Sequence, residues 1–198
     1  MRNILLVGWL LLPIGVWAYH EGPGQDRLAM EETDAVVQAA RSAVDAEKWP
    51  EAVRRYEEAI AKLPRTEGLD LTSVERRLRL ELNKARMLDA GLPTARTELA
   101  ELVEQIAKEP GKDAALLDES RQALARAQFY TTWLKRLEGV TREEWEPEIE
   151  AARQNYRLLA ESATDPTAKA KHLEDLEAAI HLERMQIEDL QGLPLPGE

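Results

Sequence analysis

Histidines are the first side chains to consider, because they could hold a metal or move protons. The three histidines are His20, His172 and His181. His172 and His181 are nine residues apart, so on one helix they point in different directions. Glu177 precedes His181 by four residues, a spacing that favours an ion pair along a helix. We therefore expect no metal site.

Pairs of neighbouring acidic residues are the next candidates, since general acid–base catalysis often uses two carboxylates. Such pairs occur at Glu31-Glu32, Glu57-Glu58, Glu143-Glu144 and Glu174-Asp175. Catalytic carboxylates need a cleft and perturbed surroundings, whereas these stand beside Arg and Lys on polar helix faces. The sequence also has no Cys, no Gly-x-Ser-x-Gly and no phosphate-cradling glycine loop. We expect a protein that is not an enzyme and that binds no cofactor.

The three tryptophans that follow the N-terminal segment are the last candidates for a functional role. Trp49 opens an amphipathic segment, and Trp133 and Trp145 flank a turn at Gly139. The simplest interpretation is that Trp133 and Trp145 pack one helical hairpin together. The alternative is that one of them is an exposed aromatic anchor for a partner.

Helical periodicity dominates the chain and predicts the elements that hold these side chains. Aromatic residues make up 5% of the chain, so the core must be built from Leu, Ala and Ile. Apolar residues recur every three or four positions, and no alternating strand pattern follows the first residues. The sequence therefore predicts an all-α protein of about seven helices joined by short loops.

Prolines, glycines and caps give the expected boundaries. The predicted helices run from about Arg27 to Asp45, from Pro50 to Pro64, from near Ser73 to Gly91, from Pro93 to before Pro110, from about Asp113 to Leu137, from near Thr141 to Ala163, and from Asp165-Pro166 to Gly192. Pro50, Pro93 and Pro166 suit a first helical turn, where no intrahelical partner for an N–H is lost.

Apolar spacing also predicts which side chains face inward. In the third predicted helix they are Val74, Leu78, Leu82, Ala85 and Leu88, and in the last Leu173, Leu176, Ile180, Ile187 and Leu190. A heptad-like column at Leu117, Leu124 and Leu134 is compatible with a coiled coil.

The run EKWPEAVRRYEEAIAKLP, residues 47–64, carries a family resemblance. With Pro64 as its closing proline, it resembles the second helix of a tetratricopeptide repeat, with Ala52, Tyr56 and Ala59 at the family's Ala, aromatic and Ala positions. The same alignment places Ala40 at the small residue of the first helix. The resemblance covers about residues 33–66.

The sequence departs from the family where Val36 and Ala43 replace the first helix's Trp and Tyr. The resemblance implies antiparallel helical hairpins stacked as a short tetratricopeptide-like α-solenoid, with an up-and-down helical bundle as the alternative. It also implies that the concave side of the first helix binds a partner. In this alignment that side consists of Asp34, Val37, Arg41, Val44 and Asp45.

The N-terminus has the pattern of an export segment. Arg2 is followed by an uncharged run from Ile4 to Ala18, too short at about 1.5 Å per residue for an easy bilayer crossing. Two alternatives remain open: residues 1–18 are a signal peptide cleaved after Ala18, or they stay as a membrane anchor. We expect a linker at 19–26, a helical domain at 27–192 and a disordered tail at 193–198. Both alternatives predict a cell-envelope or periplasmic location.

Net charge limits the partners. The formal charge is −11 at pH 7, which argues against nucleic acid and against anionic lipid surfaces. We expect a protein or peptide partner, with basic segments preferred, and contact to the membrane only through residues 4–18. The leading hypothesis is an exported or membrane-tethered adaptor for protein–protein interaction. The alternative is a structural, self-associating bundle or coiled-coil component of an envelope assembly.

Overall fold

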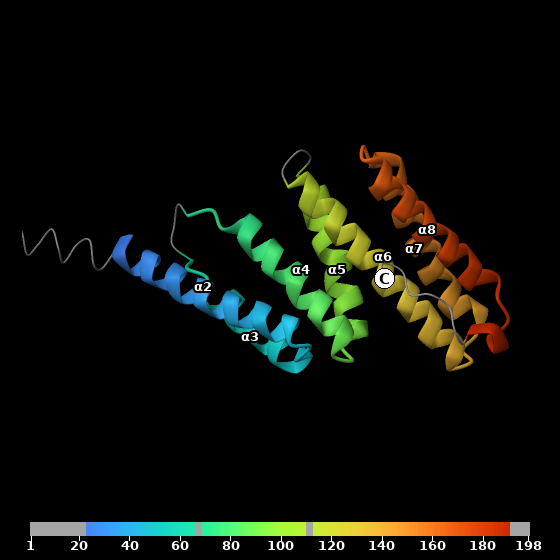
Figure 1. Cartoon of the computed structure of the whole chain (residues 1–198), viewed down its shortest axis with the longest axis horizontal. Helices are drawn as coiled ribbons and strands as arrows, with labels where there is room; N and C mark the ends of the chain where they lie inside the picture. The colour runs from blue at the N-terminus through green and yellow to red at the C-terminus, as the bar shows by residue number, and fades with distance from the viewer. Residues whose placement is uncertain (1–22, 66–68, 110–112, 191–198) are drawn as a thin grey trace, which may run out of the picture. The chain divides into compact units, whose positions relative to one another are not determined.

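The protein is all-α, as the periodicity predicted. A computed structural model describes residues 23–65, 69–109 and 113–190, and within these ranges it contains seven α-helices, one short 3-10 helix and no strand (Figure 1). The elements are α2 (Pro23–Asp45), α3 (Trp49–Lys62), α4 (Thr72–Leu88), α5 (Leu92–Ala107), α6 (Ala114–Leu137), α7 (Arg142–Ser162), α8 (Pro166–Arg184) and η1 (Ile187–Leu190). The predicted export segment at 1–18 and tail at 193–198 lie outside the described residues. α2 begins at Pro23, inside the segment expected to be a linker.

Helix starts follow the proline signals. Pro50, Pro93 and Pro166 all stand at the first positions of their helices, as predicted. The carboxylate of Asp165 accepts a hydrogen bond of 2.8 Å from the N–H of Ala168, which caps α8. Pro147 does not break α7: it is the sixth residue of the helix and removes one intrahelical hydrogen bond, the one to the carbonyl of Glu143.

Three helix ends share one turn geometry. At the ends of α2, α4 and α6, a residue with positive φ lets an N–H reach back to the helix: Glu47, Ala90 and Gly139 have φ of 55°, 55° and 74°. Each turn closes with an N–H bonded to the carbonyl five residues earlier, as from Lys48 to Ala43 at 2.9 Å. Only the third turn uses glycine, so the first two hold an L-residue in a region that costs conformational energy.

The chain forms two compact units, residues 1–78 and 79–198, and their boundary falls within α4. In the first unit, α2 and α3 make an antiparallel hairpin, with Lys62 Nζ 3.5 Å from the Glu32 carboxylate at its open end. Ala40, Ala52 and Ala59 are fully buried, as expected for a close helix crossing. These positions do not by themselves identify a tetratricopeptide repeat, because any close crossing selects small residues.

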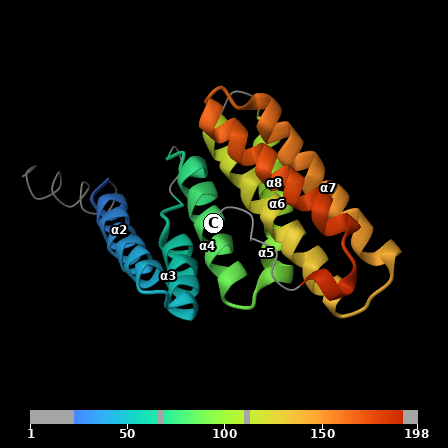
Figure 2. The ribbon, with the colours of Figure 1, turned by 45° about the vertical axis from the view of Figure 1, so that its right-hand side comes forward.

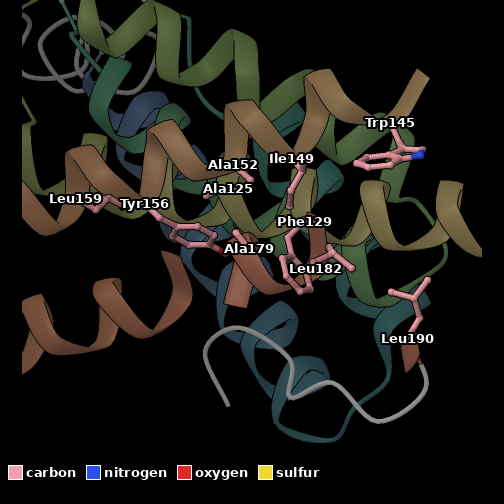
Figure 3. Close-up of a cluster of buried hydrophobic side chains, with 10 residues drawn as sticks. All are labelled: Ala125, Phe129, Trp145, Ile149, Ala152, Tyr156, Leu159, Ala179, Leu182 and Leu190. Carbon is pink, nitrogen blue, oxygen red and sulfur yellow. The ribbon is translucent and has the colours of Figure 1, made fainter. Parts of the chain in front are cut away.

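The second unit is organised around α6, which packs on α5 and on α7, while α7 also packs on α8. Both views show α6, α7 and α8 side by side (Figure 2). One core cluster joins α4, α5 and α6, including Leu80, Leu99 and Leu124. A second joins α6, α7, α8 and η1 around Phe129 and Tyr156 (Figure 3). A helix buried on two sides fixes the spacing of its neighbours, which matters for the site below.

The inward face predicted for α8 is wrong in part: Leu176 packs against the second core cluster, as predicted, but Leu173 does not. Leu173 is 48% exposed, and the buried residues are Asp175, Ala179 and Leu182. Ala179 lies in the same core cluster as Ala152 of α7, and both are fully buried. Two alanines allow a close approach of the helices, so residue size selected the buried face rather than hydrophobicity alone.

The predicted extent of α8 is also wrong, because the helix ends at Arg184 rather than continuing to Gly192. Arg136 of α6 donates its two Nη groups to the carbonyl oxygens of Leu182 and Met185. These are carbonyls at the end of α8 that lack a helical donor. The chain then turns into η1, which buries Leu190 in the second core cluster and leaves Ile187 exposed.

Candidate functional site

The partner-binding residues predicted from the sequence lie along α2. Asp34, Arg41 and Asp45 are exposed, and Val37 and Val44 are half-buried. The five side chains are therefore accessible in the first unit, as a binding face requires. Their role in binding remains a prediction.

A second candidate surface is a groove within the second unit, of which the sequence predicted only the alternative that Trp133 or Trp145 is an aromatic anchor for a partner. It has a volume of about 900 Å³ and is formed by the C-terminal end of α4, the start of α5 and one face of α6. We call it the α4–α6 groove. Its lining residues are Lys84, Met87, Leu88, Ala90, Leu92, Pro93, Glu119, Gln122, Ala123, Arg126, Tyr130, Trp133 and Leu134.

The turn between α4 and α5 shapes one side of the groove. The N–H of Gly91 donates to the carbonyl oxygen of Arg86 at 2.8 Å, and a Cβ at Gly91 would lie only 3.1 Å from that oxygen. α4 therefore stops at Leu88, and Leu92 re-enters the core at the start of α5. Leu88, predicted to face inward, is 58% exposed because it lies at the last position of its helix.

Aromatic side chains of α6 form the facing side. The rings of Tyr130 and Trp133 stack with centroids 6.4 Å apart and an interplanar angle of 25°. Leu134 beside them is 48% exposed. The two tryptophans of this hairpin thus have different places: Trp145 belongs to the second core cluster, whereas Trp133 packs against that cluster and also lines the groove. The Nε1 of Trp133 is buried with no acceptor in the described structure.

Charges in the groove are few and unevenly paired. Lys84 Nζ lies 2.9 Å from the Glu81 carboxylate and 3.8 Å from that of Glu119. Arg126 is half-buried and forms no ion pair among the residues that the structure describes. The groove therefore contains one cation, Arg126, whose charge no lining carboxylate neutralises at short range.

Arg126 also acts on buried polar groups of α7 and α8. Asp175 is only 5% exposed, and burial raises the pKa of its carboxyl, an effect that the charge of Arg126 partly opposes. Burial likewise raises the pKa of the Tyr156 hydroxyl, and the nearby Asp175 raises it further. The hydroxyl of Tyr156 is buried with no hydrogen-bond partner in the described structure. Asp175 was expected on a solvated face and is instead held beside the core.

The remaining chemical candidates are dispersed. His172 is half-buried and His181 is exposed, while His20 lies outside the described residues. No group of three or more metal-binding side chains occurs in the part of the chain that the structure describes. The column Leu117, Leu124 and Leu134 does not form one surface seam for a coiled coil, because Leu124 is buried in the core cluster that joins α4, α5 and α6.

The signal for the groove was present in the sequence only in part. Leu88 is followed directly by a turn, so its place at a helix end could have marked it as exposed. Tyr130 and Trp133 are three residues apart, which places them on neighbouring positions of one helix face. The distance between α4 and α6, which makes a groove of these residues, has no local signature.

No family model, curated protein or solved structure is significantly similar to this chain. None of the helices in the described ranges carries an apolar stretch long enough to span a bilayer.

Proposed function

We propose that this protein is a non-enzymatic helical adaptor that binds a segment of a partner polypeptide in the α4–α6 groove. The observation that carries the proposal is the gathering of exposed apolar side chains around one concave surface. Leu88 and Leu134 are 58% and 48% exposed, and Trp133 lies with them. Exposed apolar side chains gathered in one patch mark interaction sites more often than the rest of a protein surface does.

The form of the groove supports a polypeptide ligand. Its two walls come from helices, one wall carrying aromatic and one carrying aliphatic side chains, and the exposed leucines Leu88 and Leu134 are among the lining residues. Amphipathic helices and extended segments bind to such grooves through a few apolar anchors. Aromatic side chains at the centre of such a surface usually contribute most of the binding free energy.

The proposal includes an extracytoplasmic location. It rests on the apolar run at residues 4–18, which either is removed after Ala18 or stays as an anchor to the cytoplasmic membrane. N-terminal sequencing of the soluble and membrane fractions tests this part, with Tyr19 or Met1 as the expected first residue. The intact chain recovered free in the cytoplasm would contradict it.

Photocrosslinking in living cells tests the binding role. A photoreactive amino acid replaces Leu88 in the groove, Val37 on α2, or Leu173 on α8. Leu173 is the matched control, since it is an exposed leucine of similar accessibility to Leu134 but lies outside the groove. We expect a crosslinked partner at Leu88 and none at Leu173, with the partner identified by mass spectrometry.

Two other outcomes would change the conclusion. Crosslinks from Val37 alone would move the binding surface to α2, the face predicted from the sequence. Crosslinks between copies of this chain would favour the structural, self-associating alternative, and light scattering would then show a stable oligomer.

A further inference from the structure

The lining of the groove is not acidic, unlike the chain as a whole. The chain carries −11, but the charged lining residues are Lys84 and Arg126 against Glu119 alone. Net charge predicts a basic partner, whereas the groove predicts the opposite. The local charges decide which groups a ligand meets at contact, because interactions beyond roughly 10 Å are screened at physiological salt.

Lys84 is already paired within the protein. The ammonium of Lys84 lies between two carboxylates, at 2.9 Å from Glu81 and 3.8 Å from Glu119. A ligand would gain little binding free energy from Lys84, because it would have to compete with these carboxylates. Arg126 is different, since the residue is half-buried, lines the groove together with Ala123 and Tyr130, and forms no ion pair in the described structure.

A guanidinium beside apolar surface is well suited to a carboxylate. It offers parallel N–H donors that match two carboxylate oxygens, and partial burial strengthens the attraction. The charge of Arg126 opposes the rise of the Asp175 pKa, but the two side chains form no ion pair within the described residues. Arg126 therefore has no carboxylate in ion-pair contact among the described residues.

We propose that the α4–α6 groove binds an acidic-hydrophobic polypeptide segment, with apolar side chains between Leu88 and the Tyr130–Trp133 rings and a carboxylate on Arg126. This inference rests on the proposed function and adds the chemistry of the ligand. A basic segment would place its cation beside Arg126 and lose free energy by like-charge repulsion.

Fluorescence anisotropy with defined peptides tests the inference. Three labelled ten-residue peptides share the same Leu and Phe positions, and their two flanking polar positions are Glu, Gln or Lys. With the whole 198-residue chain in lipid nanodiscs, we expect the Glu peptide to bind about tenfold more tightly than the Gln peptide, the effect of one charge-assisted hydrogen-bonded pair. The Lys peptide should bind most weakly.

Three variants locate the effect. Arg126→Gln should remove the preference for Glu over Gln while leaving the Gln peptide's affinity unchanged. Asp175→Asn should strengthen Glu-peptide binding a few-fold, because a competing carboxylate near Arg126 is lost. Arg121→Gln is the matched control on α6, since Arg121 pairs with Asp118 and does not line the groove. It should change nothing, and circular dichroism checks that each variant is folded.

Several results would overturn the inference. It is wrong if the Lys peptide binds most tightly, if the preference survives Arg126→Gln, or if a labelled fatty acid binds while no peptide does. If no peptide binds but Leu88 crosslinks to a partner in cells, the ligand chemistry is wrong and the adaptor role stands. If no peptide binds and Leu88 also fails to crosslink, both the ligand chemistry and the adaptor role are wrong.

Discussion

Arg136 is the buried cation whose removal should affect the second unit most. It is 7% exposed and donates to the carbonyl oxygens of Leu182 and Met185 at the end of α8, while its guanidinium lies 4.8 Å from the centroid of the Trp145 ring. Arg136→Met keeps an unbranched stem of similar packing volume and removes only the guanidinium. The change therefore isolates the polar contacts of this residue.

The expected cost follows from those contacts. Hydrogen bonds from a charged donor contribute about 1.5–3 kcal/mol each, and the ring contact adds about 0.5–1 kcal/mol. Desolvation offsets part of this, as shown by the lowering of the Arg136 pKa by burial. We expect the free energy of unfolding to fall by roughly 2–4 kcal/mol, since two carbonyls near the end of α8 lose their donor.

Urea unfolding measures the loss, and hydrogen exchange of the α8 and η1 amides shows where it arises. Arg142→Met is the matched control, because Arg142 lies 5.8 Å from the same ring but its side chain is 61% exposed. The control should change stability by no more than about 0.5 kcal/mol. A cost for Arg136→Met below about 1 kcal/mol, or equal to that of the control, would refute this account of the end of α8.

Three further changes have clear expected outcomes in urea unfolding. Ala52→Leu should cost about 1–3 kcal/mol by overpacking the α2–α3 crossing, whereas Ala61→Leu on an exposed position should be near neutral; equal effects would contradict the crossing. Glu47→Gly should stabilise by about 1 kcal/mol, because glycine adopts φ of 55° without strain, and Ala46→Gly should not. Burial raises the Asp175 pKa above its ordinary value of 3.8, so its ionisation costs folded stability as pH rises. Asp175→Asn should therefore gain stability over the parent chain from about pH 4 through the raised pKa and then level off; a gain that shrinks with rising pH would contradict this.

Helix positions were predictable because their signals are local. Pro50, Pro93 and Pro166 marked the starts, and apolar spacing marked Ala52, Tyr56 and Ala59 as buried. The α8 face was not predictable, since Leu173 and Ile180 have the stronger apolar character but Ala179 permits the closer contact with α7. Which of two possible faces is buried depends on the partner helix, and one helix's sequence does not contain that information.

The groove escaped prediction for a related reason. Each of its walls looks ordinary in the sequence: a leucine at a helix end and two aromatic residues on a long helix. The hollow exists because α6 is packed on two sides while α4 stops at Leu88, and both facts are tertiary. Arg126 was likewise one arginine among many until its lack of a short ion pair became visible.

Heteronuclear NMR of the chain during titration with the Glu peptide tests the central claim most directly. The reporters are the Met87 methyl and the Trp133 indole N–H, both from residues that line the groove, with Trp145 and Val37 as references. The account predicts saturable shifts at Met87 and Trp133, and little change at Trp145 or Val37. Shifts confined to Val37 and its neighbours on α2, with the groove signals unmoved, would contradict it.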